Sequence, residues 1–270
     1  MGQQGTQNNL SAEIVRGFKL PLPPLPEQKA IAAALSDTDE LIAGLEALVA
    51  KKRAIKQGAM QQLLTGRKRL PGFTGEWEEK RLGDLTSISS GGTPNTQVNT
   101  YWDGEIRWMS SGDLNLKFVN EVDGRITLDG LQNSSAKMVP KGCILIGLAG
   151  QGKTRGTVAI NHVELSTNQS IASVWPSNQY SSSYLYYNLD SRYEELRSLS
   201  TGDGGRGGLN LTILANLPVP YPTLPEQQAI AAVLSDMDAE IESLQTQLGK
   251  TRALKQGMMQ ELLTGRIRLV

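Results

Sequence analysis

The sequence predicts an α+β protein in which one globular domain of mixed strands and helices is held between two long helices. Residues 25–70 recur at 224–269, and 29 of the 46 aligned positions are identical. The segment between the copies has a different composition, with short β-branched runs separated by Gly, Asn, Ser and Thr. Because the two copies of the repeat flank one unique segment, we expect the copies to be related by pseudo-two-fold symmetry and the unique segment to be asymmetric.

Each copy of the repeat is predicted to be one long helix. Both copies begin Leu-Pro-Glu-Gln, and both end Thr-Gly-Arg. Proline is tolerated at the first helical position, and a carboxylate there suits the positive end of the helix dipole. Gly66 and Gly265 are placed to adopt the left-handed conformation that closes a helix. About 40 residues without proline lie between these signals. At ~1.5 Å per residue they predict a rod of roughly 60 Å.

Apolar residues in both helices recur in steps of four and three, the pattern of a heptad seam that packs against one partner helix. The seam residues are Ile31, Leu35, Thr38, Ile42, Leu45 and Val49 in the first copy, and Ile230, Leu234, Met237, Ile241, Leu244 and Leu248 in the second. The alternative is two separate core helices of an ordinary globular protein.

Two glycines, Gly58 and Gly257, lie inside the predicted helices, at a cost of about 1 kcal/mol each relative to alanine. If the copies pair antiparallel with their ends matched, Gly58 faces Ala232 and Gly257 faces Ala33. Small residues on both sides would then let the two backbones approach closely.

The middle of the chain is predicted to contain short strands and polar turns, with one helix over residues 182–198. The predicted strands are residues 106–109, 143–146, 157–160 and 170–174. The segment closes with residues 209–214 and a proline-punctuated extended run at 217–225, and the stretch 209–223 has a counterpart near the start of the chain. Residues 10–24 align with that stretch at the same offset of 199, so the first 24 residues are expected to be the end of a second, similar domain.

These patterns divide the chain into four parts. They are a domain remnant at 1–24, a first spacer helix at 25–69, a globular domain at 70–223 and a second spacer helix at 224–270.

Residues 147–154 match the phosphate-binding pattern G-x-x-x-x-G-K-[ST]. A phosphate-binding loop requires a helix behind it, whose amide groups hold the phosphates. Here the next residues are glycine-broken and β-branched, which predicts a second strand and makes the motif the tip of a hairpin. We therefore interpret it as a polar, basic finger. A nucleotide-hydrolysing enzyme is the less favoured alternative for this motif.

Composition excludes several other classes of function. With one cysteine, Cys143, and one histidine, His162, most zinc and Cys/His arrangements are excluded, and no catalytic constellation is found. A single cysteine also indicates a reducing compartment. The absence of an apolar run of ~18–20 residues and the polar N-terminus predict a cytoplasmic protein with no membrane partner. Since 27 basic residues balance 27 acidic ones, any nucleic-acid binding would have to be local or shared with a more basic partner.

Several short motifs are spread over nearly the whole chain. They are Leu-Pro-Glu-Gln at 25 and 224, Lys-Gln-Gly to Thr-Gly-Arg at 56–67 and 255–266, the domain opening at 70–85, Gly-Gly-Thr-Pro at 91–94, Tyr-Trp at 101–102 with Ile-Arg-Trp at 106–108, Thr-Asn-Gln at 167–169 and the closing run at 210–220. With this set the chain resembles the DNA-specificity (S) subunit of type I restriction–modification systems, in a half-subunit form with one target recognition domain.

The resemblance implies a globular α/β target recognition domain and two spacer helices that form an antiparallel coiled coil. It implies a non-catalytic subunit that binds double-stranded DNA, recognises one half of a bipartite site, and docks methyltransferase (modification) and restriction subunits. S-adenosylmethionine and ATP with magnesium would then belong to those subunits, and this chain would hold no cofactor. Full-length members carry two recognition domains, so a homodimer or a partner half-S chain is expected. The alternative is a coiled-coil assembly protein without base-specific readout.

Candidate DNA-contacting residues are polar side chains on the predicted loops, whose donors and acceptors suit base edges and phosphates. They are Thr93, Asn95, Gln97, Asn99, Tyr101, Ser110, Ser111, Gln151, Lys153, Thr154, Arg155 and Arg206. The candidate coiled-coil residues are Ile31, Leu35, Ile42, Leu45, Gly58, Ile230, Leu234, Ile241, Leu244 and Gly257.

Overall fold

The computed structural model describes residues 12–150, 152–199 and 208–269. Two helices of 39 residues each, α2 (Leu25–Leu63) and α8 (Leu224–Leu262), accompany a part that is rich in strands. The predicted α+β fold class is confirmed.

The chain divides into two compact units, and each is described by itself. The first contains Met1–Arg53 and Ala239–Val270, and the second contains Ala54–Asp238. Each long helix is therefore shared between the two units.

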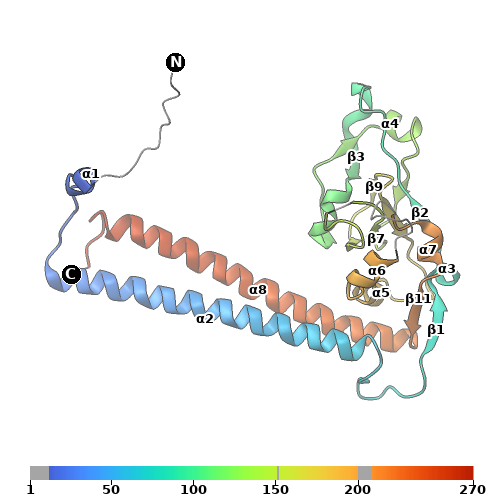
Figure 1. The fold of residues 1–270 in the computed structure, drawn as a ribbon, viewed down its shortest axis with the longest axis horizontal. Helices are drawn as coiled ribbons and strands as arrows, with labels where there is room; N and C mark the ends of the chain where they lie inside the picture. The colour runs from blue at the N-terminus through green and yellow to red at the C-terminus, as the bar shows by residue number, and fades with distance from the viewer. Residues whose placement is uncertain (1–11, 151, 200–207, 270) are drawn as a thin grey trace. The chain divides into compact units, whose positions relative to one another are not determined.

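In the first unit α2 and α8 run side by side in opposite directions (Figure 1). Lys255 forms an ion pair with Asp39, and Lys52 forms one with Glu240 at 2.6 Å. Because a residue early in one helix contacts a residue late in the other, the pairing is antiparallel. A short helix, α1 (Ala12–Arg16), precedes them and has no buried residue.

The predicted seam residues lie along the least exposed line of each helix. Ile31, Leu45, Val49 and Ile241 are buried, and Leu35, Thr38, Ile42, Leu244 and Leu248 are half-buried. In the second unit Ile230 and Leu234 are buried, and Met237 is half-buried. In the first unit their neighbours on the helices are mostly exposed, as expected for a narrow two-helix seam, whereas in the second unit this part of α8 also packs into the core of the domain.

The predicted close approach at the helix glycines is wrong. A Cβ atom added to Gly58 or Gly257 would meet no other atom within 4 Å. Thr38 Oγ1 lies 3.8 Å from Met258 Sδ, so Gly257 is level with Thr38 rather than with Ala33. The register is shifted by roughly five residues because the start of each helix is bound to residues beyond the end of the other.

An ion pair joins the start of each long helix to an arginine beyond the end of the other helix, and this pair occurs once in each unit. In the first unit Arg268 donates two hydrogen bonds to Glu27, both 2.6 Å long. In the second unit Arg69 donates to Glu226 at 2.5 and 2.6 Å. The two pairs are equivalent under the repeat. In both, the arginine follows a glycine turn with positive φ, +69° at Gly66 and +72° at Gly265, as predicted.

The strands of the second unit form three sheets. The strands are β1 (Glu78–Arg81), β2 (Ile88–Ser90), β3 (Trp102–Met109), β4 (Phe118–Val119), β5 (Arg125–Ile126), β6 (Met138–Val139), β7 (Ile144–Gly147), β8 (Val158–Asn161), β9 (Leu165–Thr167), β10 (Ile171–Val174) and β11 (Pro218–Tyr221). The sheet orders are β2-β10-β7-β8-β4, β5-β3-β9-β6 and β1-β11. All four predicted strands are present.

Short helices connect and cover these sheets. They are α3 (Leu82–Leu85), α4 (Leu128–Gln132), α5 (Ser182–Asp190), α6 (Tyr193–Ser198) and α7 (Leu211–Ala215), with 3₁₀ helices η1 (Asn99–Tyr101) and η2 (Ser111–Leu116). The single helix predicted over 182–198 is wrong, because it breaks at Ser191 and Arg192. The Ser191 hydroxyl bonds to the Asn188 carbonyl, and Arg192 reaches the Pro218 carbonyl at 2.7 Å.

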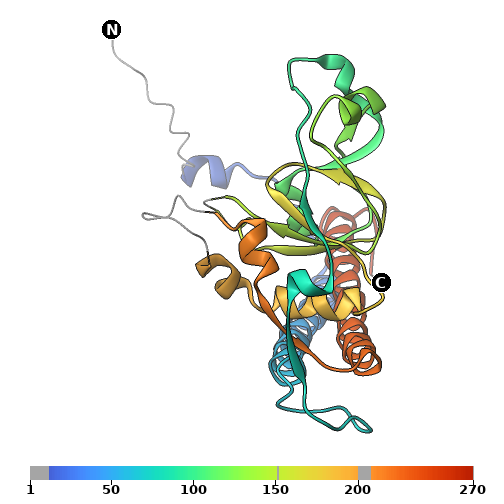
Figure 2. The ribbon, with the colours of Figure 1, turned by 90° about the vertical axis from the view of Figure 1, so that its right-hand side faces the viewer.

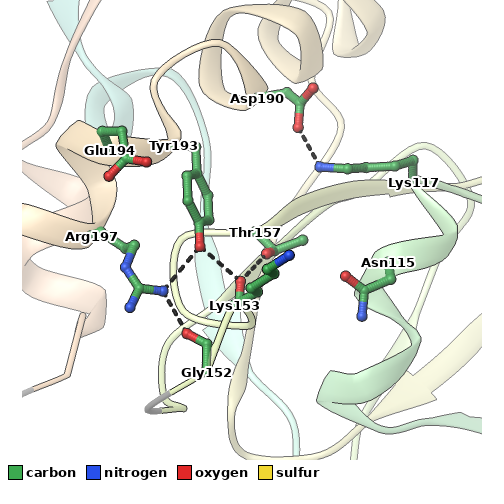
Figure 3. Close-up of a pocket in the computed structure, with 9 residues that line it drawn as sticks. All are labelled: Asn115, Lys117, Gly152, Lys153, Thr157, Asp190, Tyr193, Glu194 and Arg197. Carbon is green, nitrogen blue, oxygen red and sulfur yellow. Dashed lines mark hydrogen bonds and ion pairs between the residues drawn. The ribbon is translucent and has the colours of Figure 1, made fainter.

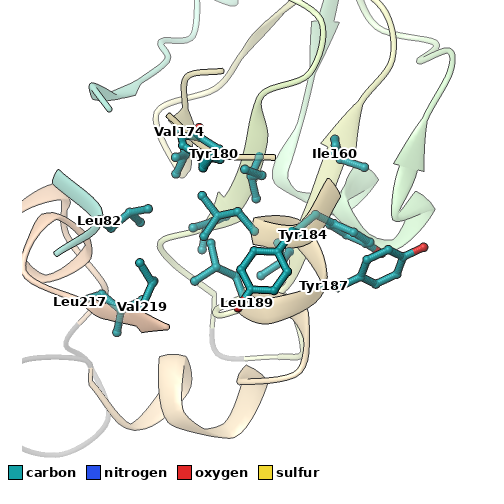
Figure 4. Packing of buried hydrophobic residues seen from close by; sticks show 14 of the residues in the cluster. Leu82, Ile160, Val174, Tyr180, Tyr184, Tyr187, Leu189, Leu217 and Val219 are labelled. Carbon is teal, nitrogen blue, oxygen red and sulfur yellow. The ribbon is translucent and has the colours of Figure 1, made fainter. Parts of the chain in front are cut away.

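Both faces of the five-stranded sheet are buried. Ile144 and Ile146 of β7 pack into one hydrophobic cluster, and Leu145 between them packs into another, because successive side chains of a strand point to opposite faces. Helix α5 lies along the first face (Figure 2), where Tyr184 and Tyr187 join the cluster (Figure 4).

The ends of the long helices within the second unit belong to the same core. Leu63 and Leu64 of the first repeat and Ile230 and Leu234 of the second are all part of the cluster beneath α5. Tyr187 Oη donates to Asp238 at 2.8 Å, and Lys56 binds the other oxygen of that carboxylate. The domain is therefore anchored directly on the paired helices of its own unit.

The phosphate-loop pattern is a hairpin tip, as predicted. Strands β7 and β8 pair antiparallel, with Ile146 opposite Val158, and no helix follows the loop. The Gly147 amide donates to the Thr157 carbonyl, and the Gly156 amide donates back to Gly147, both at 2.9 Å. Among the described residues no helix is long and apolar enough to cross a membrane.

Candidate nucleic-acid interface

Three of the predicted DNA-contacting segments meet at one turn, residues 167–170 between β9 and β10. The Gly92 amide donates to the Thr167 carbonyl at 2.8 Å, and the Asn168 amide donates to Met109, the residue before Ser110, at 3.0 Å. The Leu148 amide at the base of the finger donates to Ser170 at 2.8 Å. The turn therefore ties together the glycine loop, the end of β3 and the finger.

The paired glycines of the first loop are required by this close approach. A Cβ atom at Gly91 would lie 2.0 Å from the Thr167 carbonyl oxygen, and one at Gly92 would lie 2.2 Å from Ser135 Oγ. Neither distance is tolerated by any other residue, since real Cβ atoms do not come so close. The Trp108 indole also donates to the Gly92 carbonyl at 3.0 Å.

Gln169 is a further candidate for DNA contact, which was not among the residues predicted from the sequence. It is exposed, and its side-chain oxygen accepts a 2.6 Å hydrogen bond from the Thr93 hydroxyl. The bond fixes the amide plane, so the Gln169 amide group is presented in a defined orientation beside the glycine loop. The Thr-Asn-Gln motif was the available signal, but nothing in the sequence joined it to Thr93.

The loop after Thr93 presents exposed amides. Asn95, Gln97 and Asn99 are exposed, and Tyr101 is half-buried. The Asn95 side chain accepts from the Gln97 amide at 3.0 Å, and its carbonyl accepts from the Trp102 indole at 3.2 Å. This loop is thus held by its own hydrogen bonds, while Gln97 and Asn99 stay accessible.

Two of the predicted contacts, Ser110 and Arg155, are less accessible than the sequence suggests. The Ser110 hydroxyl bonds to Asp113 at 2.9 Å in a capping box at the start of η2, so its hydrogen-bonding capacity serves the helix end. Arg155 is only 8% exposed, and a buried guanidinium does not reach a base edge from that position. Ser111 is half-buried.

On the finger, Lys153 is exposed and Thr154 is half-buried. No ion pair joins Lys153 to another described residue. Gln151 and Arg206 lie outside the residues that the structure describes.

Three other cations near these loops are paired with carboxylates, and two of them share one carboxylate. Arg107 and Arg125 both bind Glu121, at 2.8 and 2.9 Å, and Lys117 binds Asp190 at 2.6 Å. The hydrogen bond from Arg107 is the main reason that the pKa of Glu121 is lowered to about 2. Lys153, which is exposed and has no ion pair among the described residues, is therefore a cation available to a phosphate.

The catalytic and metal-binding groups are equally sparse in the described part of the chain. Cys143 is fully buried, which raises the pKa of its thiol to about 12 and leaves no reactive thiolate near neutral pH. No group of three or more His, Cys, Asp or Glu side chains is placed to hold a metal ion among residues 12–150, 152–199 and 208–269.

The chain thus combines an α+β domain, in which several polar loops are joined at one turn, with two long antiparallel helices. The family model for the type I restriction modification DNA specificity domain matches residues 2–56 and 74–250. Because these matches cover most of the chain, it belongs to the type I restriction–modification DNA specificity family.

Two curated relatives illustrate the likeness. The MjaVIII specificity subunit of Methanocaldococcus jannaschii is 26% identical over 284 aligned residues, covering 97% of this chain and 65% of the relative. The EcoR124I/EcoR124II specificity subunit of Escherichia coli is 27% identical, covering 88% of this chain and 60% of the relative. The HsdS subunit of Thermoanaerobacter tengcongensis shares the fold, with a TM-score of 0.61 at 20% identity, over 98% of this chain and 65% of that one. The chain thus spans less than two thirds of the length of these relatives.

Proposed function

We propose that this chain recognises one half of a bipartite DNA sequence as the non-catalytic specificity component of a type I restriction–modification complex. The observation that carries the proposal is the convergence of the glycine loop, the end of β3 and the finger on the turn at 167–170. Sequence readout needs several polar groups in fixed relative positions, and one turn binds all three segments.

The exposed groups suit the major groove. Asn and Gln side chains can form paired hydrogen bonds with adenine, and Lys can bind guanine or a phosphate. Gln97, Asn99 and Gln169 supply the first kind of group, and Lys153 supplies the second. Because the chain has no net charge, a large share of the phosphate contacts would come from partner subunits.

We further propose that methyltransferase and restriction subunits dock on this chain and supply the catalysis, with S-adenosylmethionine and ATP bound by them. An exposed apolar stripe on α2 supports a helical docking surface. Leu41 and Leu48 are one heptad apart, lie outside the seam, and are 51% and 38% exposed. Exposed leucines at heptad spacing are the pattern expected for a helix that packs on a further helix.

A homodimer or a partner half-S chain would supply a second recognition domain. Support comes from the segment at 12–22, which repeats residues 211–221. Leu217 and Val219 are buried in the core of the second unit, whereas their equivalents, Phe18 and Leu20, are 59% and 82% exposed. Phe18 and Leu20 could therefore fill, in a second recognition domain, the core positions that Leu217 and Val219 fill in this one.

The proposal is tested by selecting DNA from a random duplex pool with the chain assembled with its methyltransferase subunits. We expect a bipartite consensus, and we expect the consensus to change or relax at single positions when Gln97 or Gln169 is replaced by Ala. Enrichment of no sequence would favour the alternative, a coiled-coil assembly protein. Calorimetry with ATP tests a third function, that of a nucleotide-hydrolysing enzyme. Micromolar ATP affinity in the parent chain that is lost in Lys153→Ala would favour that function.

A further inference from the structure

The tip of the finger is held to α6 through its backbone. Arg197 Nη1 donates to the Gly152 carbonyl at 2.6 Å, and Tyr193 Oη donates to the Lys153 carbonyl at 3.1 Å (Figure 3). The two α6 residues are four apart in sequence and therefore share one face of the helix.

The two anchoring side chains also hold each other. Arg197 Nη1 also donates to Tyr193 Oη at 2.9 Å, so both N–H groups of Nη1 are used. The guanidinium lies 5.7 Å from the Tyr193 ring centroid. On the finger, the Thr157 hydroxyl donates to the same Lys153 carbonyl at 2.6 Å. The tip is thus restrained from α6 and from the start of β8.

Close packing at the base of the finger supports the same attachment. Gly156 has a φ of +78°, and a Cβ atom there would lie 3.2 Å from the Tyr193 carbonyl and 3.4 Å from Leu196 Cβ. Leu196 is fully buried. Helix α6 therefore contacts the finger at both its base and its tip.

These contacts leave the Lys153 side chain free for a ligand, because only backbone carbonyls of the tip are used. The ammonium group is directed toward Asn115 and Lys117, on the side of a 760 Å³ pocket away from Arg197 (Figure 3). Lys117 is paired with Asp190, and Glu194 on the α6 side of the pocket would repel a phosphate. Of the two lysines that line the pocket, Lys153 is therefore the one available to an anion that approaches the tip.

We propose that Tyr193 and Arg197 are positioning residues that hold the finger so that Lys153 contacts a DNA phosphate. This inference rests on the proposed DNA-recognition function. A restrained loop loses little conformational freedom when it binds, so its contact contributes more to affinity than the same contact from an unrestrained loop. Neither Tyr193 nor Arg197 needs to touch DNA.

The test measures DNA affinity and its salt dependence for the chain assembled with methyltransferase subunits. Lys153→Ala should weaken binding about tenfold and lower the salt slope by about one, as loss of one phosphate contact does. Arg197→Ala should weaken binding by a similar factor. In the Lys153→Ala background it should have no further effect, because Arg197 acts through Lys153.

Two further variants separate positioning from general damage. Tyr193→Phe keeps the ring and removes one donor, so it should weaken binding by a smaller factor without a change in thermal stability. Ser198→Ala, on the same helix, should bind like the parent, because its hydroxyl bonds only within α6.

Additive losses in Lys153→Ala/Arg197→Ala would overturn the inference, since Arg197 would then act independently. An unaltered affinity in Lys153→Ala, in a chain that still selects a bipartite site, would also overturn it and leave the proposed function standing. Failure of the parent complex to select any site would reject both.

Discussion

At the scale of single residues, the ion pair of Glu226 with Arg69 combines deep burial with full hydrogen bonding. Glu226 is 0% exposed and also accepts from the Trp77 indole at 3.1 Å. Glu226→Gln should lower the free energy of unfolding by about 3 kcal/mol, because it leaves the arginine without its counter-charge. Urea denaturation measures the change. The repeat provides the control: Glu27→Gln removes the equivalent pair, but Arg268 is largely exposed, so its effect should be smaller. Equal effects would contradict this account.

The ion pair between Arg107 and Glu121 determines how this carboxyl titrates in acid. Arg107 holds the pKa of Glu121 at about 2, below its ordinary value of 4.5. A carboxyl whose pKa is lowered by folding stabilises the protein above the unfolded pKa, and this contribution is lost as pH falls from about 4.5 toward 2. In an NMR titration, Arg107→Gln should raise the pKa of Glu121 toward 4.5. Arg125→Gln should raise it less, since the charge of Arg125 is a smaller cause. The reverse order would refute the assignment.

At the scale of elements, the two long helices allow a direct test of seam against surface. Leu45 is buried in the seam, so Leu45→Ala should lower the free energy of unfolding by about 2–3 kcal/mol. Leu48→Ala on the same helix should change it by less than about 0.5 kcal/mol, as exposed substitutions usually do. In pull-down titrations, however, Leu48→Ala should weaken methyltransferase binding. A loss of stability in Leu48→Ala equal to that in Leu45→Ala would contradict the seam.

The helix glycines test the observed register. Gly58→Ala and Gly257→Ala place a methyl group where no atom lies within 4 Å, and alanine is favoured over glycine in a helix. Each should raise the free energy of unfolding by about 0.5–1 kcal/mol in thermal or urea unfolding. Destabilisation by either change would instead indicate the close backbone approach predicted from the sequence.

These elements also mark how far the sequence alone reaches. Proline, glycine and heptad spacing located both helices, and the β-branched run after Lys153 identified the hairpin, because those signals are local. The five-residue stagger depends on Glu27 meeting Arg268, and the interface depends on residues 167–170 meeting segments up to 76 positions away. The burial of Arg155 and the break at Ser191 are likewise decided by tertiary contacts, which periodicity does not encode.

At the scale of the whole molecule, two equivalent apolar segments differ in burial: residues 211–221 are covered by the domain, and residues 12–22 are exposed. Residues 211–221 close the domain of the second unit, where β11 pairs with β1 and α7 packs near α3. Their equivalents at 12–22 have the same apolar spacing but are exposed. Since the binding place for such a segment is already filled in this chain, a second domain that lacks its own closing segment fits residues 12–22 better than an intact copy does.

Matched substitutions in the two segments should affect association and stability differently. Phe18→Ser with Leu20→Ser should leave thermal stability unchanged, because both side chains are exposed, and should reduce association in sedimentation velocity, whether with a second copy or with a partner half-S chain. The equivalent pair, Leu217→Ser with Val219→Ser, should instead lower thermal stability strongly, because both side chains are buried in the core. If the Phe18 and Leu20 variant sediments like the parent over the full concentration range, with and without the partner chain, the segment is not an association surface.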